Sequence, residues 1–107
     1  MSLDVYLRAV RLTDVYEDNI THNLAKMANE AGLYKPVWRP EVWEIKTAQQ
    51  LIDPLRAGLS ILLNEPERFK KFDPDNGWGN YDGLVSFVRL YLAACEENPD
   101  AEVVVSR

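Results

Sequence analysis

The chain opens with an alternating stretch, Leu3-Asp4-Val5-Tyr6-Leu7-Arg8-Ala9-Val10. Because successive side chains of a strand point to opposite faces, the apolar side chains at Leu3, Val5, Leu7 and Ala9 would share one face. This pattern predicts a half-buried strand near residues 3–10.

A second strand is predicted at the other end of the chain. The run Val103-Val104-Val105 is β-branched, which favours a short strand near residues 102–106. A lone two-stranded ribbon is marginal in water. We therefore expect these two strands to pair, with helices covering one face of the ribbon.

Between the strands the apolar period changes from two to 3.6 residues, which is typical of amphipathic helices. Apolar stripes predict helices near residues 19–31, 48–63 and 80–97. The predicted fold class is therefore α+β and helix-dominated. We expect one compact domain, residues 1–107, with a short sheet that pairs the N- and C-terminal strands.

Local signals mark the ends of these helices. Gly32 suits the positive φ that often follows a helix, and Thr47 with Gln50 resembles a capping box. Pro54 lies inside the second helical pattern, so we expect a kink or a restart there. Residues 13–18 are interpreted as a loop or a helical turn, and residues 34–46 as a connector with two prolines.

Composition excludes several classes of function. The chain has 107 residues, 47 % of them hydrophobic and 27 % charged, enough for one core without disulfides or metals. A net charge of −5 disfavours binding to nucleic acid. No apolar run approaches the roughly 20 residues of a membrane span, and the first residues lack a signal-peptide pattern. These features and the single cysteine favour the cytoplasm, with no membrane partner.

The usual catalytic and metal-binding constellations are missing. The chain has one histidine and one cysteine, so a zinc site would need carboxylates in an arrangement that the sequence does not show. Cys95 falls on the apolar stripe of the last predicted helix, where a thiol is usually inert. We expect no metal, no cofactor and no catalytic residue, with one alternative at His22.

Unusual polar and aromatic residues gather in three segments instead. They are Asn19-Ile20-Thr21-His22-Asn23, Trp38-Arg39-Pro40 and Asn76-Gly77-Trp78-Gly79-Asn80-Tyr81. We expect these segments to meet at one concave surface, where Asn19, His22, Asn23, Trp38, Arg39, Asn76, Trp78 and Tyr81 would bind a ligand.

Each segment has a functional interpretation and a structural one. On a helix, Asn19, His22 and Asn23 would share one face at the edge of the core. Alternatively, Asn19 caps the helix and His22 is half-buried. Trp38 could stack a ring while Arg39 holds an anion. Alternatively, Trp38 fills the core and Arg39 pairs with a surface acid.

The third segment has glycines on both sides of Trp78. They allow positive φ and close approach of the backbone to a ligand, and free N–H groups at the start of the next helix could hold an anion. Alternatively, the segment is a tight turn pinned by the packing of Trp78. Asn76 and Tyr81, the other two residues of this segment in the expected site, stand at its two ends.

The same segments carry a resemblance. The strings Tyr16-x-x-Asn-Ile-Thr-His-Asn-Leu, Met27-Ala28-x-Glu30-Ala31-Gly32-x-Tyr34, Trp38-Arg39-Pro40, Asn76-Gly77-Trp78-Gly79-x-Tyr81 and Val103-x-Val105-Ser106-Arg107 resemble a family of small uncharacterised proteins from bacteriophages, prophages and bacteria. The resemblance spans nearly the whole chain. It implies a phage-type cytoplasmic accessory protein and carries no catalytic or binding residues with it.

Three functions remain open. The first is a binding module for a small planar anionic ligand of nucleotide type, because tryptophan, arginine, histidine and asparagine suit such a molecule. The second is an acidic interaction module that inhibits or modulates a host protein. The third is an enzyme that uses His22 as a general base.

Overall fold

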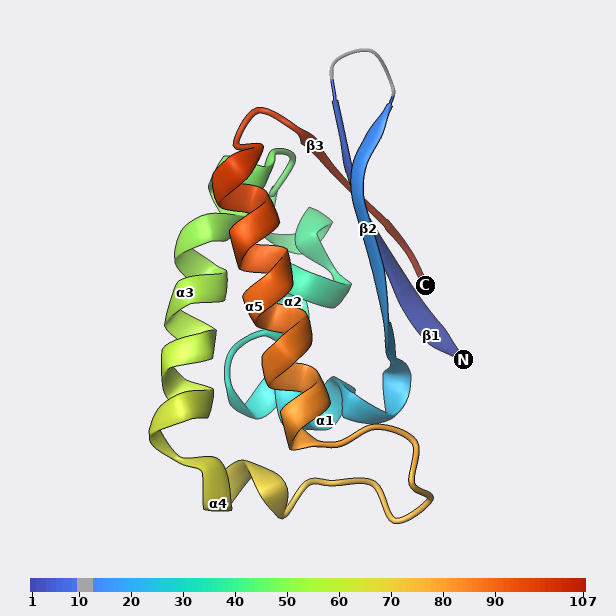
Figure 1. Cartoon of the computed structure of the whole chain (residues 1–107), viewed down its shortest axis with the longest axis vertical. Coiled ribbons are helices and arrows are strands. Elements are labelled where there is room, and N and C mark those ends of the chain that lie inside the picture. The colour runs from blue at the N-terminus through green and yellow to red at the C-terminus, as the bar shows by residue number, and fades with distance from the viewer. Residues whose placement is uncertain (10–12) are drawn as a thin grey trace.

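The computed structural model describes residues 1–9 and 13–107. The strands β1 (Ser2–Arg8), β2 (Asp14–Thr21) and β3 (Glu102–Ser106) form one antiparallel sheet in the order β2-β1-β3. The helices pack against one face of this sheet (Figure 1). β1 pairs with β3 in a register that sets Val5 opposite Val105, so the predicted pairing of the chain ends and the predicted α+β class are confirmed.

The alternation in β1 gives the sheet its two faces. Leu3, Val5 and Leu7 are fully buried on the side of the helices. Ser2, Asp4, Tyr6 and Arg8 are only partly buried, because the opposite face of the sheet has no helix on it (Figure 1). The end of the predicted strand, residue 10, lies outside the described residues.

β2 corrects two expectations. Residues 14–18 are strand rather than loop or helical turn, and the predicted helix 19–31 is wrong at its start, because residues 19–21 complete β2. A 3₁₀ turn, η1 (His22–Leu24), follows, and α1 (Ala25–Glu30) comes only after it. The strand forms because the residues of β2 from Asp14 to Thr21, apart from Val15 at a bulge, pair with residues of β1.

The remaining elements follow more closely from the sequence. They are α2 (Tyr34–Trp38), η2 (Pro40–Trp43), α3 (Ala48–Asn64), α4 (Pro66–Lys70) and α5 (Tyr81–Glu97). The predicted helices 48–63 and 80–97 are confirmed as α3 and α5, which lie side by side (Figure 1). The segment 34–46 is not a plain connector, because α2 and η2 fold within it.

The helix ends show the chemistry that the sequence indicated. Gln50 Oε1 accepts the backbone N–H of Thr47 at 3.0 Å, and Gly32 has a φ of +75°. We expected a kink or a restart at Pro54; α3 is continuous through this residue, so the restart does not occur. Proline removes only the bond to the Gln50 carbonyl, and Gln50 is exposed, so water can solvate that carbonyl.

The core lies between the sheet and the α3–α5 pair. Trp38, Tyr91 and Phe69 are its largest fully buried side chains. Gly58 lets Leu33 approach α3 closely, since a Cβ at this position would collide with the Leu33 side chain. Within residues 1–9 and 13–107, no helix combines the length and the apolar character needed to cross a membrane.

Candidate functional site

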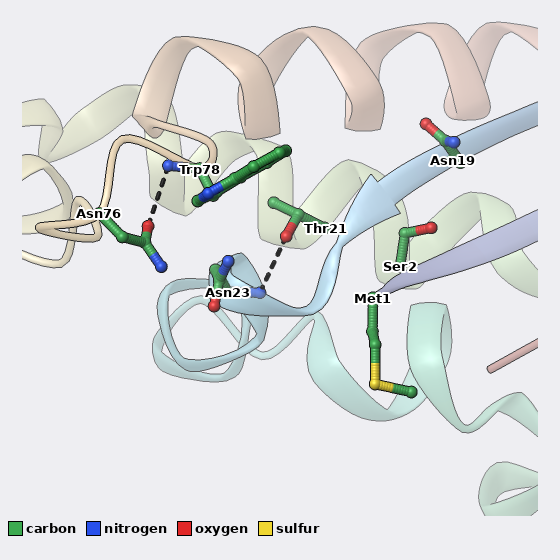
Figure 2. A pocket seen from close by; sticks show the side chains of 7 residues that line it. All are labelled: Met1, Ser2, Asn19, Thr21, Asn23, Asn76 and Trp78. Carbon is green, nitrogen blue, oxygen red and sulfur yellow. Dashed lines mark hydrogen bonds between the residues drawn. The ribbon is translucent and has the colours of Figure 1, made fainter.

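A cleft of about 550 Å³ opens at the end of the sheet where β1 begins and β2 ends. One wall comes from the two strands and η1, and the other comes from the loop that joins α4 to α5 (Figure 2). The residues that line the cleft are Met1, Ser2, Asn19, Thr21, Asn23, Asn76 and Trp78.

The strand wall follows from the antiparallel register. Ser2 lies opposite Thr21, so their side chains share the face of the sheet that carries no helix. Thr21 Oγ1 accepts the backbone N–H of Asn23 at 3.3 Å (Figure 2). This bond caps η1, turns the chain away from the sheet and places Asn23 at the end of the cleft.

The loop wall depends on two glycines. Gly77 and Gly79 have φ values of +76° and +93°, a region that other residues rarely adopt. Asn76 Oδ1 accepts the backbone N–H of Trp78 at 2.9 Å, which fixes the turn (Figure 2). A Cβ on Gly79 would stand 2.8 Å from Thr21 Cγ2, so the loop sits directly on the end of β2.

Trp78 stands between these two walls. Its side chain is 66 % exposed, although tryptophan is the largest apolar residue available to a core. Figure 2 shows the indole ring near Thr21, facing the end of the strand. An exposed aromatic ring beside polar groups is typical of ligand-stacking surfaces.

Four of the eight predicted site residues line this cleft. They are Asn19, Asn23, Asn76 and Trp78. The predicted secondary structure was wrong for two of them. Asn19 lies in β2 and Asn23 in η1, rather than together on one helix face. His22, Trp38, Arg39 and Tyr81 do not line the cleft.

Trp38 and His22 meet elsewhere. Trp38 is 2 % exposed, and its Nε1–H donates to His22 Nδ1 at 3.0 Å. A ring buried this deeply offers no face to a ligand, so Trp38 belongs to the core. In this arrangement the neutral imidazole uses Nδ1 as an acceptor and carries its proton on Nε2. Neither nitrogen then has a free lone pair for general-base catalysis.

Arg39 and Tyr81 also have structural contacts in place of the expected site contacts. Arg39 is exposed and donates from Nε to the Tyr34 hydroxyl at 3.3 Å. Tyr81 is buried, and its hydroxyl donates to the carbonyl of Leu62 at 2.7 Å. The anion contact that we expected from Arg39 is therefore not available in the cleft.

Three lining residues were missed by the sequence interpretation: Met1, Ser2 and Thr21. Their shared position at the paired ends of β1 and β2 could have been found only if β2 had been recognised as a strand. Among the described residues that line the cleft, no side chain is charged. No group of three His, Cys, Asp or Glu residues in the described part of the chain could hold a metal ion.

Cys95 is expected to react slowly with a thiol reagent in the native protein. It is a free cysteine with no exposed surface, and burial raises the pKa of its thiol to about 12. The reactive thiolate is therefore scarce at neutral pH, and access requires the core to open. Labelling should become fast in denaturant, where the same thiol is exposed. Fast labelling without denaturant would contradict the buried position.

We compared the chain with protein-family models, with curated proteins and with solved structures, and none of the three comparisons produced a match. The features of the cleft that bear on function are its volume, its amide and hydroxyl groups, and the exposed ring of Trp78.

Proposed function

We propose that the protein is a cytoplasmic binding module for a small planar polar ligand of nucleoside type. The ring of the ligand would stack on Trp78, and amide side chains would recognise its hydrogen-bonding edge. The exposed indole beside three asparagines in a cleft of about 550 Å³ is the observation that supports this proposal.

The amide groups suit a heterocyclic base. Each asparagine side chain presents a donor and an acceptor in one plane, the arrangement that also occurs along the edge of a base. Asn19 and Asn23 are exposed, so their amides are open to a ligand. Asn76 uses Oδ1 for the Trp78 N–H, which leaves its NH₂ group as a donor. Ser2 and Thr21 add hydroxyl groups.

The charge around the cleft favours an uncharged ligand over the anionic one expected from the sequence. That expectation depended on Arg39, which contacts Tyr34 instead. A neighbouring hollow on the same face of the sheet is lined by Asp4, Glu17 and Asp18 and shares Asn19 with the cleft. These carboxylates would repel a phosphate group. A nucleoside should therefore bind more tightly than its monophosphate.

Tryptophan fluorescence tests this proposal. Adenosine, guanosine, cytidine and uridine, and their 5′-monophosphates, would be titrated into the protein. At least one nucleoside should quench the emission. Trp78→Ala, measured by isothermal titration calorimetry because it removes the responding ring, should weaken its binding by about 1–3 kcal/mol, the usual contribution of one base–aromatic stack. Asn23→Ala should weaken it less, through loss of one hydrogen bond.

Two control variants separate the cleft from other surfaces. Trp43 is also exposed, at 48 %, but lies in η2 and not in the cleft, so Trp43→Ala should leave the affinity unchanged. Arg39→Ala should also leave it unchanged. The proposal is overturned if all eight compounds fail to bind at about 1 mM, a free energy near −4 kcal/mol. Equal losses from Trp43→Ala and Trp78→Ala would also reject it.

A further inference from the structure

The outer edge of β2 is the open edge of the sheet. On the opposite side, β3 is partly covered, because Val103 N–H donates to the Lys46 carbonyl and Thr47 pairs with Glu102. In the part of the chain that the structure describes, no backbone segment pairs with the outer edge of β2. An open edge presents a row of N–H and C=O groups that another strand can use.

The direction of these groups follows from the ladder with β1. His22 N–H donates to the Met1 carbonyl. Going back along β2 from His22, the backbone groups of every second residue therefore bond to β1, and those of the residues between them point away from β1. Glu17, Asn19 and Thr21 are the outward-pointing set. Asn19 N–H is already bonded to Asp18 Oδ1 at 2.8 Å. The Asp18 carboxylate oxygen therefore takes the position of a carbonyl oxygen of an added strand, which would accept the same N–H.

A groove runs between this edge and α5. It has a volume of about 370 Å³ and is lined on the strand side by residues 18–21 and Leu24. On the helix side, Gly83 and Ser86 are small and leave room, while Phe87 forms the floor and Leu90 the apolar wall. Leu90 is 55 % exposed, so a large apolar side chain borders the groove. Figure 1 shows α5 alongside β2.

The acidic residues of β2 limit which strand could pair with its open edge. β2 carries Asp14, Glu17 and Asp18 and no basic residue. Asp14 is paired with Arg8 at 3.0 Å, but within the described residues no ion pair joins Glu17 or Asp18 to a base. Antiparallel pairing of two copies through β2 would bring acids opposite acids, which is destabilising. A basic strand is the complementary partner.

We propose that the groove between β2 and α5 binds an extended segment of a partner protein, which adds to β2 as a fourth strand. Side chains on one face of that segment would enter the groove beside Ser86 and Leu90, so they should be apolar. Side chains on its other face would lie beside Glu17, so they should be basic. The partner segment therefore has alternating apolar and basic residues, a mode of recognition that other sheet edges use.

A labelled seven-residue peptide of alternating lysine and valine is a direct probe, with binding followed by fluorescence anisotropy. The full chain should bind it. A peptide with the same composition, but with its lysines in one block and its valines in another, should bind about tenfold more weakly or worse. Methylating the peptide's backbone nitrogens on the edge that faces β2 should also prevent binding, because that edge then lacks donors.

Matched variants locate the site. Ser86→Trp should fill the groove and abolish binding, while Ser60→Trp, at an exposed position of α3, should not. Glu17→Lys should weaken binding by about tenfold, while Asp53→Lys on α3 should leave it unchanged. Leu90→Asn removes the apolar wall at an exposed position without adding a charge, so it tests the groove even if Ser86→Trp fails to fold.

The outcomes are distinct. Equal affinity for the alternating peptide and for the peptide with separate lysine and valine blocks would overturn the proposal. Unchanged affinity in both the Ser86 and the Leu90 variants would also overturn it. Either result would show that the peptide is held only by attraction between opposite charges. A dimer of the unmodified chain that Leu90→Asn converts to a monomer would identify a second copy as the occupant, and would also overturn the proposal. Nucleoside binding should survive Leu90→Asn, since Leu90 does not line the cleft of Trp78, so the two proposals can fail separately.

Discussion

Trp38→Ala is expected to lower the free energy of unfolding by about 3–5 kcal/mol, the usual result of removing a large aromatic side chain from a core. Trp38 is 2 % exposed and stacks on Tyr34 with their ring centroids 5.9 Å apart. Its carbonyl also accepts a hydrogen bond from Arg107 Nη1 at 3.0 Å, which ties α2 to the end of β3. Urea denaturation followed by circular dichroism would measure the change.

Trp78→Ala is the matched control for Trp38→Ala. The same side chain is removed, but Trp78 is 66 % exposed, so the free energy of unfolding should change by no more than about 0.5 kcal/mol. His22→Ala should fall between the two, at about 1–3 kcal/mol, because the buried indole N–H of Trp38 loses its acceptor. Similar stability losses for the two tryptophans would contradict the different positions assigned to them.

The parts of the fold that the sequence predicted are those with strong local signals. β1 alternates over seven residues, and α3 and α5 each carry a helical apolar stripe over 17 residues. The Gln50 side chain and the Asn80 cap mark where these two helices begin. Such patterns are read from neighbouring residues alone, and tertiary contacts only reinforce them.

β2 was missed because its signal is not local. Along this strand only Ile20 is buried, and acids stand on both faces, so the alternation of a half-buried strand is weak. Pairing with β1 makes it a strand. Tyr16 then stacks on Tyr91 of α5 at 5.9 Å, and its hydroxyl donates to Asp18 at 3.1 Å. These contacts join residues far apart in the sequence and cannot be seen in a window of ten residues.

Only four of the eight residues predicted for the site line the cleft, for a related reason. Trp38 and Trp78 both stand beside residues that break helices and strands, so their surroundings in the sequence look alike. Their environments differ because Pro36 and Val37 are buried with Trp38 in α2, while Trp78 stands 66 % exposed between two glycines with positive φ. Only the packing of α2 against α1 and α3 decides which ring is exposed.

Gly79→Ala is expected to lower the free energy of unfolding by about 2–5 kcal/mol and to abolish nucleoside binding. The new Cβ would stand 2.8 Å from Thr21 Cγ2 and 2.9 Å from Leu24 Cδ1. Leu24 is 2 % exposed and cannot move aside. Overpacking of this kind destabilises by about 1–3 kcal/mol, and a positive φ adds about 1–2 kcal/mol for a residue with a Cβ.

Gly77→Ala separates these two effects. Gly77 has a φ of +76°, but a Cβ there would meet no atom within 4 Å. This variant should therefore show the backbone strain alone, about 1–2 kcal/mol, and keep nucleoside binding. Thermal denaturation and tryptophan quenching of both variants would test the difference. Equal effects would mean that the loop depends on backbone conformation alone. A larger loss for Gly79→Ala, with binding lost only there, is the result expected if contact with Thr21 and Leu24 holds Trp78 at the cleft.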